Sequence, residues 1–271
     1  MCATCGCSDA GGVTVTDPGG TTHRHDHDHG HDHVEGHGHR HAEDHEHGGH
    51  GHDHDTRTVQ LEQAVLARND ELAGRNRRWL DDRGILALNL MSSPGSGKTT
   101  LLERTVRELA TERAVSVIEG DQETLLDAER IRATGARVVQ INTGAGCHLD
   151  AEMLADGVRT LDPPDRSLLL IENVGNLVCP ALFDLGEHAK VVITSVTEGA
   201  EKPLKYPHMF RAAQLVLLNK IDLLPHVEFD VERFTDAVHR ANPRADVLQL
   251  SATRGDGVPD WYRWLSTRVS A

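Results

Sequence analysis

At residues 92–100 the chain reads Ser92-Ser93-Pro94-Gly95-Ser96-Gly97-Lys98-Thr99-Thr100, between an apolar run at 85–91 and a helical pattern that starts at Leu101. This order predicts a strand, a tight loop and a helix. Small residues in such a loop let successive backbone N–H groups point at a phosphate, and the following helix adds the positive end of its dipole. We therefore expect the loop to bind nucleotide phosphates, with Lys98 reaching the β- and γ-phosphates and the Thr99 hydroxyl ligating Mg²⁺.

One position of this loop departs from the usual pattern G-x-x-x-x-G-K-[ST], because Ser92 stands where the first glycine is expected. A chance turn rich in glycine and serine is the alternative interpretation. The Gly-Ser-Gly-Lys-Thr core and its position between a strand and a helix favour phosphate binding.

Strand-sized apolar runs and helical patterns alternate along the rest of the chain. This alternation predicts an α/β fold, a mostly parallel β-sheet flanked by helices. In such sheets ligands gather at the carboxyl ends of the strands, so we expect the chemistry in the loops that follow them. The further strands are expected at residues 114–118, 137–141, 166–171, 190–194, 214–218 and 246–250, with helices at 101–111 and on the segment that ends near Ile131.

The composition excludes several classes of protein. The formal net charge is −14, of which residues 1–57 contribute −8, so no basic face for nucleic acid is expected. The apolar runs are too short to cross a membrane and no secretory signal opens the chain, so the expected compartment is the cytoplasm. Five cysteines, an odd number, argue against a disulfide framework and are better explained by metal binding.

The segment after the run at 214–218 predicts which base is bound. It reads Asn219-Lys220-Ile221-Asp222, and Ser251-Ala252 follows the run at 246–250. A carboxylate at Asp222 can accept hydrogen bonds from N1–H and the exocyclic amine of guanine, a donor pair that adenine lacks. Asn219 would hold the base and the neighbouring loop, the stem of Lys220 would cover the ring, and the backbone near Ala252 could donate to O6. We therefore expect GTP and GDP rather than ATP.

Two acidic residues that follow strands are candidates to hold Mg²⁺, directly or through water, alongside Thr99. They are Asp121 and Glu172, and with Lys98 and Thr99 they form the expected catalytic set. A helix N-cap is the alternative role for either acid. Gly175 resembles the glycine of a turn that senses a γ-phosphate, and no water-orienting glutamine follows it, so we expect slow intrinsic hydrolysis.

The N-terminal segment carries two kinds of metal ligand. Cys2, Cys5 and Cys7 are close enough for three thiolates to meet on one ion such as Ni²⁺ or Zn²⁺. Residues 23–54 hold 14 of the 19 histidines, which predicts a disordered tract that binds several divalent ions. The alternative for the three cysteines is a tail with incidental thiols. The alternative for the histidine tract is a solubilising tail or, in part, an engineered tag. The expected ligands in the tract include His25, His27, His29, His31 and His33.

A second candidate metal site lies in the globular part. Cys147 and His148 are adjacent after the run at 137–141, and Cys179 follows Gly175 by four residues. Adjacent ligands need others from elsewhere to complete a site, which favours a site shared across a two-fold interface. Two buried structural cysteines and a loop histidine are the alternative.

Residues 59–80 have helical periodicity, so the expected regions are a disordered metal-binding tail (1–57), an N-terminal helix (58–84) and a GTPase domain (85–271).

These motifs together resemble the HypB family, GTPases that assist nickel insertion into [NiFe]-hydrogenase. The resemblance rests on residues 1–7, the histidine-rich tract, SSPGSGKTT, EGDQET, NTGAGCHLD, IENVGNLVCP, NKID and SATRGDG. It implies a P-loop G domain of the SIMIBI class that forms a GTP-dependent homodimer, with a HypA-like nickel donor or acceptor and the hydrogenase large-subunit precursor as partners. It also implies metal sites at Cys2, Cys5 and Cys7 and at Cys147, His148 and Cys179, the latter holding nickel or zinc.

The expected function is therefore that of a GTP-hydrolysing nickel metallochaperone whose tail also stores nickel. The related urease nickel GTPases resemble the chain less, because they typically place a proline between the Cys and His that are adjacent here. Nickel storage and detoxification is a second hypothesis, supported by the histidine tract. An ordinary P-loop ATPase or kinase is a third, and Asp222 argues against it.

Overall fold

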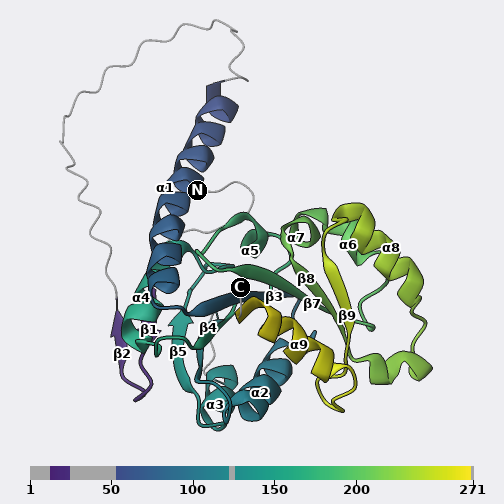
Figure 1. Cartoon of the computed structure of the whole chain (residues 1–271). Helices are drawn as coiled ribbons and strands as arrows, with labels where there is room; N and C mark the ends of the chain where they lie inside the picture. Colours follow the sequence, from purple (N-terminus) through teal and green to yellow (C-terminus); the bar gives the residue numbers. More distant parts are fainter. Residues whose placement is uncertain (1–12, 25–52, 122–125, 270–271) are drawn as a thin grey trace, which may run out of the picture.

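The computed structural model describes residues 13–24, 53–121 and 126–269. Within them the chain forms one β-sheet with helices on both faces (Figure 1). The strands are β1 (Thr14–Thr16), β2 (Thr22–Arg24), β3 (Leu86–Ser92), β4 (Val115–Asp121), β5 (Arg137–Asn142), β6 (Leu168–Glu172), β7 (Ala189–Ser195), β8 (Leu215–Asn219) and β9 (Asp246–Gln249). The helices are α1 (Asp53–Asp82), α2 (Lys98–Leu109), α3 (Leu126–Arg132), α4 (Ala151–Leu161), α5 (Cys179–Leu182), α6 (Lys202–Lys205), α7 (Pro207–Ala212), the 3₁₀ helix η1 (Ile221–His226), α8 (Val231–Ala241) and α9 (Val258–Val269).

The strand order across the sheet is β2-β1-β5-β4-β6-β3-β7-β8-β9. The strands from β3 to β9 pair in parallel, and β1 and β2 pair antiparallel at one edge. The predicted α/β class is thus confirmed, and each predicted strand is present within two residues of its expected bounds at either end apart from the end of β4, which extends to Asp121. Because β3 lies centrally between β6 and β7, the phosphate loop that follows it opens at the middle of the carboxyl edge.

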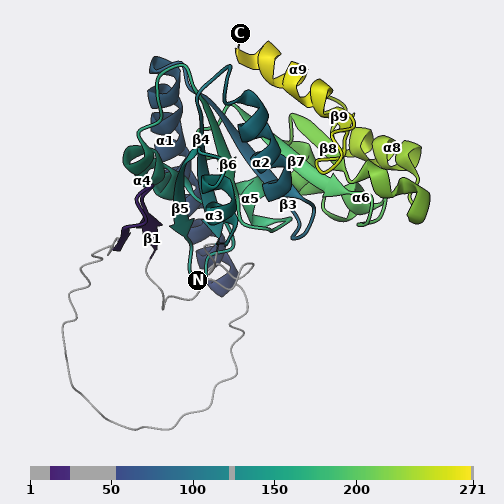
Figure 2. The same cartoon turned by 90° about the horizontal axis from the view of Figure 1, so that it is seen from below.

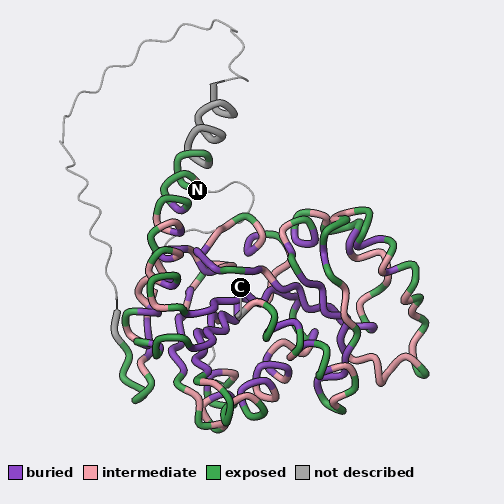
Figure 3. The backbone as a smooth tube through the Cα atoms, viewed as in Figure 1, coloured by how far each residue is buried: buried purple, intermediate pink, exposed green. Residues whose placement is uncertain are grey.

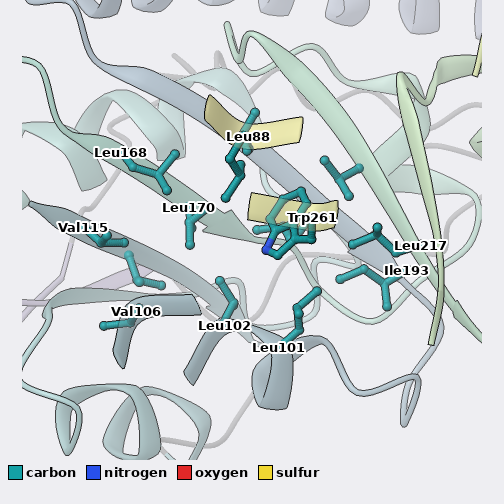
Figure 4. Packing of buried hydrophobic residues seen from close by; sticks show 14 of the residues in the cluster. Leu88, Leu101, Leu102, Val106, Val115, Leu168, Leu170, Ile193, Leu217 and Trp261 are labelled. Atoms are coloured by element: carbon teal, nitrogen blue, oxygen red, sulfur yellow. The ribbon is translucent and has the colours of Figure 1, made fainter. Parts of the chain in front are cut away.

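One face of the sheet is covered by α2, α3 and α9. Alternate residues of the strands point to this face and meet aliphatic side chains of α2 and the buried indole of Trp261 on α9 (Figure 4). Trp261 is fully buried, and its Nε1 donates to Thr105 Oγ1 at 3.1 Å, so its polar atom is satisfied. This packing fixes the first helix after the phosphate loop against the sheet.

The opposite face carries two separate groups of helices. The helices α1 and α4 pack over the β5, β4, β6 and β3 half, where Leu80 and Leu154 are buried. The helices α7 and α8 pack over the β7, β8 half, where Phe210 and Phe234 are buried. In Figure 2 α4 and α8 lie toward opposite edges of the sheet.

Helix α1 is longer than the predicted helix at 59–80. It begins at Asp53 and ends at Asp82, and its first turns project beyond the sheet in Figure 1. Figure 3 shows buried positions on the half that approaches the sheet, where Asn69, Ala73, Asn76 and Leu80 are buried. The helix is anchored by this half, through polar as well as apolar contacts.

The expected disordered tail at 1–57 differs from the structure at two short strands and at residues 53–57, which form the start of α1. The hairpin of β1 and β2 adds to the edge of the sheet, with Val15 opposite Ile141 and only 1% exposed. The sequence gives little sign of these strands, because Thr-Val-Thr and Thr-His-Arg contain no hydrophobic run. Three-residue strands depend on pairing, which β5 provides for β1 and β1 for β2. None of the helices within the described residues has both the length and the hydrophobicity that a membrane span requires.

Candidate functional site

The phosphate loop lies between β3 and α2, as predicted. Ser92, at the position of the usual first glycine, is fully buried and donates from Oγ to the carbonyl of Ser93 at 2.8 Å. The loop starts against the segment after β7, because Ser93 Oγ contacts Glu198 and lies 3.0 Å from Lys202 Nζ. The serine is therefore accommodated, and the loop is tied to the segment that follows β7.

Gly97 is required by a close approach. Its φ is +96°, and a Cβ at this position would lie 2.5 Å from Asn219 Nδ2. That amide donates to the carbonyl of Ser96 at 2.8 Å, so a hydrogen bond from Asn219 holds the phosphate loop in place. A side chain at residue 97 would be strained by its φ and would also push Asn219 away.

A cavity of about 490 Å³ opens over this loop. Its walls come from the phosphate loop, the ends of β4 and β6, helix α3 and Lys220. Side chains and backbone of these elements line it: residues 92–100, Glu119, Gly120, Asp121, Asp127, Arg130, Glu172, Asn173, Val174, Gly175 and Lys220. The predicted phosphate-binding and Mg²⁺-binding residues therefore share one cavity.

Lys98, Thr99 and Glu172 are in contact at the floor of this cavity. Thr99 Oγ1 donates to Glu172 Oε1 at 2.8 Å, and Lys98 Nζ lies 3.2 Å from the same oxygen. Glu172 is 2% exposed, and its other oxygen, Oε2, is buried with no hydrogen-bond partner. The next helix begins only at Cys179, so the alternative role of Glu172 as an N-cap is wrong.

Oxygen ligands suit Mg²⁺, and the arrangement fits that ion. Glu172 offers an unpartnered buried carboxylate oxygen beside the Thr99 hydroxyl. Asp121, half-buried at the end of β4, lines the same cavity, and its carbonyl accepts from Thr143 N at 2.9 Å. These groups can hold the ion directly or through water.

Glu119 is a further acidic residue of the site that the sequence analysis missed. It lies directly opposite Glu172 in the parallel register of β4 and β6, is 2% exposed and leaves Oε2 without a partner. Burial, with the nearby charges of Glu172 and Asp121, raises its pKa to about 9. The sequence held a signal for it, because residues two apart on a strand share a face, and Glu119 is two residues before the predicted ligand Asp121.

The predicted base-binding segment follows β8. Asn219 is buried, and its Oδ1 accepts from Ala252 N at 3.0 Å, which joins the segment at 219–222 to Ser251 and Ala252. Ala252 N–H is thus engaged by Asn219, so the expected donation to guanine O6 would need a different backbone group. Lys220 has a φ of +62° and donates from Nζ to the carbonyl of Gly95 at 2.7 Å.

The other predicted base-binding residues, Asp222 and Ser251, lie in η1 and directly after Leu250, which follows β9. Asp222 is half-buried in the first turn of η1. Ser251 is fully buried, and its Oγ accepts from Arg254 N at 3.0 Å, which shapes the turn after β9. The cavity over the phosphate loop includes Lys220, so the base-binding segment borders the phosphate end of the site.

Cys147, His148 and Cys179 come together as predicted. Their ligand atoms all lie within 4.8 Å of one another, and Cys147 Sγ is 3.5 Å from His148 Nδ1. Cys179 begins α5 and is 8% exposed. Two sulfur ligands and an imidazole suit borderline-soft ions such as Ni²⁺ and Zn²⁺.

The imidazole of this cluster is held in a fixed, neutral state. It stacks on the ring of Phe183 at a centroid distance of 4.0 Å, and burial lowers the pKa of His148 to about 4. Neutral imidazole is the form that binds metal, so His148 offers a lone pair at neutral pH. The other predicted metal ligands lie outside the described residues: Cys2, Cys5, Cys7, His25, His27, His29, His31 and His33.

Residues 86–249 match a family model described as the CobW/HypB/UreG nucleotide-binding domain. The chain is 55% identical over 215 residues to the hydrogenase maturation factor HypB of Escherichia coli (strain K12), covering 79% of this chain and 74% of that protein. It is 36% identical over 214 residues to the hydrogenase/urease maturation factor HypB of Helicobacter pylori (strain ATCC 700392 / 26695), covering 77% and 87%.

Solved structures give the same similarity. The fold matches that of HypB from Archaeoglobus fulgidus with a TM-score of 0.71 and 41% identity, covering 75% of this chain and all of that one. It matches HypB from Helicobacter pylori in complex with nickel with a TM-score of 0.70 and 36% identity, covering 75% and 95%.

Proposed function

Because the chain belongs to the HypB hydrogenase maturation factors, within the CobW/HypB/UreG family, we propose that it is a GTP-hydrolysing nickel metallochaperone. It binds Ni²⁺ and assists insertion of the ion into the [NiFe]-hydrogenase large subunit in the cytoplasm. One observation carries the proposal: Glu172 at the nucleotide cavity and Cys179 at the thiolate–imidazole cluster lie on one short segment of chain.

The phosphate loop and the base-binding segment would hold GTP or GDP. Backbone N–H groups at residues 95–100 and Lys98 would bind the phosphates, and the α2 dipole adds to the attraction. Asp222 would accept from guanine, while Asn219 keeps the base-binding segment against the loop through Ser96. Lys98 now pairs with Glu172, so phosphate oxygens would compete for its ammonium.

Thr99, Asp121 and Glu172 would hold Mg²⁺, the first directly and the acids directly or through water. The bound ion would neutralise charge that develops on the phosphates. Lys98 would stabilise the same charge from its position beside Thr99. No glutamine follows Gly175 to orient the attacking water, which supports a slow intrinsic rate.

Nickel is the cargo in this proposal. Cys147, His148 and Cys179 supply three soft ligands, and a fourth would come from water or from a second copy of the chain. Zinc suits the same ligands. Cys2, Cys5, Cys7 and the histidine-rich tract would bind additional ions.

The partners follow from the same role. A GTP-dependent homodimer would change the surroundings of the metal cluster when nucleotide binds or is hydrolysed, and nickel would pass to a partner. We propose a HypA-like nickel donor or acceptor and the hydrogenase large-subunit precursor as those partners, by similarity to the HypB relatives.

A second candidate function is nickel storage, and the composition of the tail favours it. Fourteen histidines within residues 23–54 exceed what a single delivery site needs. Storage and delivery are separable by experiment. Unchanged nickel tolerance of cells after deletion of residues 25–52 would argue against storage.

The principal test is genetic complementation. Lys98→Ala and Asp222→Ala should abolish hydrogenase maturation in cells that lack the native factor, while purified protein still binds nickel through its tail. The same cells are also grown with excess nickel in the medium, as a control that shows whether a larger supply of the ion alone restores maturation. Preserved maturation with both variants would contradict the proposal.

A further inference from the structure

Two buried side chains connect the metal cluster with the nucleotide cavity, and neither belongs to the predicted ligand sets. They are Asn173, which directly follows Glu172, and Leu149, which directly follows His148. Resting on the proposed function, we infer that Asn173 is a positioning residue that holds Leu149 and the metal loop, and so makes nickel affinity depend on the bound nucleotide. We name the contacts among Asn173, Leu149, Asn89 and Gly120 the Asn173 junction.

Asn173 joins β6 to the metal loop by hydrogen bonds. It is 1% exposed, and its Oδ1 accepts from Leu149 N at 3.1 Å and from Val174 N at 3.0 Å. One carbonyl oxygen thus holds both the residue after the metal ligand His148 and the turn that leads to Gly175. Because the two N–H groups share this oxygen, a displacement of the backbone at Val174 also moves the acceptor of Leu149, and the reverse holds too.

Leu149 makes the second connection, by packing. A Cβ placed on Gly120 would lie 2.7–2.9 Å from Cγ and both methyl carbons of Leu149, so the leucine lies directly on the backbone between Glu119 and Asp121. Leu149 is fully buried in the cluster under α4. Leu149 therefore contacts the ends of the two strands that carry Glu119 and Glu172. Its side chain packs on β4, and its N–H donates to Asn173, directly after β6.

The amide nitrogen of Asn173 extends the junction to the other wall of the metal cluster. Asn173 Nδ2 donates to Asn89 Oδ1 at 3.2 Å, and Asn89 Nδ2 donates to Glu187 Oε1 at 3.1 Å. Glu187 Oε2 accepts from Leu185 N at 2.7 Å. Leu185 lies two residues after Phe183, whose ring stacks on His148, so both the backbone and the ring that hold this imidazole are linked to Asn173.

These contacts are suited to transmit small displacements. Buried hydrogen bonds in a low dielectric are costly to break, and a close-packed interior does not absorb a shift at one contact without moving the next. Glu172 contacts Lys98 and Thr99, which would exchange partners when phosphate and Mg²⁺ bind. The adjacent Asn173 would follow Glu172, and coupling between the two sites would be reciprocal.

The test compares nickel affinity in two nucleotide states. The full chain carries Cys2→Ser, Cys5→Ser and Cys7→Ser, so that the thiolate-to-Ni²⁺ absorption band reports only Cys147 and Cys179, because histidine-only sites give no such band. Ni²⁺ is titrated in the presence of Mg²⁺ with GDP or with a non-hydrolysable GTP analogue. We expect nickel affinity to differ about tenfold between the two states in this parent protein, and less than about threefold after Asn173→Ala.

Asn69→Ala is the matched control. Asn69 is a buried amide that accepts from Ala151 N at 2.9 Å and donates to the carbonyl of Asp184 at 2.8 Å, so it holds the same segment two residues further on without touching β6. Its loss should leave the tenfold difference unchanged. If Asn173→Ala does not fold, Leu149→Ala tests the packing contact of the Asn173 junction, because the shortened side chain no longer packs on Gly120 while its N–H still donates to Asn173. The difference between the two nucleotide states should then also fall below about tenfold, and a retained tenfold difference would overturn the inference.

The outcomes separate this inference from the proposed function. A tenfold difference retained in Asn173→Ala overturns the inference, as does an equal loss in Asn69→Ala. A parent protein that binds GTP and nickel with no difference between states also overturns it, and leaves the two binding activities standing. A parent that binds no guanine nucleotide, or shows no thiolate band with nickel, overturns the proposed function itself.

Discussion

The hydroxyl of Thr99 lies 2.8 Å from Oε1 of Glu172, although the two residues are 73 positions apart in the chain. The contact joins the first turn of α2 to the end of β6, and Lys98 approaches the same carboxylate at 3.2 Å. It brings the phosphate loop and the segment leading to Cys179 into one structural unit. Several expectations depend on this unit.

Glu172→Gln should weaken the binding of Mg²⁺ at the nucleotide site. The substitution keeps the shape of the side chain but removes the charge that attracts the cation. Groups that orient a metal typically contribute 10–100-fold to its affinity, so the Mg²⁺ concentration for half-maximal binding of a fluorescent GTP analogue should rise about 10–100-fold. Glu108→Gln, on the outer part of α2, is the control, and an equal rise in both variants would exclude a specific role for Glu172.

Gly97→Ala should reduce guanine-nucleotide affinity about tenfold or more, because the new Cβ is strained at a φ of +96° and would lie 2.5 Å from Asn219 Nδ2. Isothermal titration with GDP measures the effect. Gly135→Ala tests the strain by itself, since Gly135 also has a positive φ of +89° but no atom within 4 Å of its Cβ position. Equal affinities for the Gly97→Ala variant and the unmodified protein would contradict the close approach.

Asp222→Asn should change the preferred base from guanine to xanthine. An amide offers one donor and one acceptor, which suit the carbonyl and the N–H of xanthine, whereas the carboxylate suits the two donors of guanine. Loss of two charge-assisted hydrogen bonds predicts at least about 100-fold weaker GTP binding. Competition between GTP and XTP measures this ratio, and an unchanged preference would mean that Asp222 does not read the base.

Glu119→Gln should stabilise the protein at neutral and weakly alkaline pH in the absence of Mg²⁺ and nucleotide. Burial raises the pKa of Glu119 to about 9 from an ordinary value of 4.5, so the folded state binds a proton that the unfolded state releases. The free energy of unfolding is therefore lowered progressively as pH rises from about 4.5 to about 9. Glutamine resembles the protonated form, and the gain at pH 7 should be about 1–3 kcal/mol.

Denaturant unfolding at several pH values measures this gain. The difference between Glu119→Gln and the unmodified protein should grow from pH 5 to pH 8 and stop growing above about pH 9. A gain that is the same at every pH would show that ionisation of Glu119 is not its cause.

Cys179→Ser and His148→Ala should each weaken nickel binding at the cluster. The expected loss is about 10–100-fold for each ligand, because the site has few donors and thiolate and imidazole are its soft ones. The thiolate-to-Ni²⁺ band in protein with Cys2, Cys5 and Cys7 replaced by serine measures the site. His226→Ala, an exposed histidine on η1, is the control, and a band of full strength in Cys179→Ser would contradict the assignment of that ligand.

The parts of the molecule that depend on local pattern could be predicted from the order of the residues alone. The apolar run before Ser92, the Gly-Ser-Gly-Lys-Thr core and the helical pattern after it predicted β3, the phosphate loop and α2. The order of strands and helices predicted the parallel sheet, because buried parallel strands are nearly continuous apolar runs that local periodicity reveals. That order also placed Asp121, Glu172 and Asn219 at strand ends.

Which of these residues meet depends on how the whole chain folds. The pairing of Glu119 with Glu172 depends on the register of β4 and β6, and the edge position of β1 depends on β5, neither of which a single segment encodes. The contacts of Asn173 with Leu149 and of Leu149 with Gly120 join strand β4, the segment before α4 and the segment after β6, which are far apart in sequence. Such contacts arise from packing of the whole domain, so the connection between the metal cluster and the nucleotide cavity is a property of the fold.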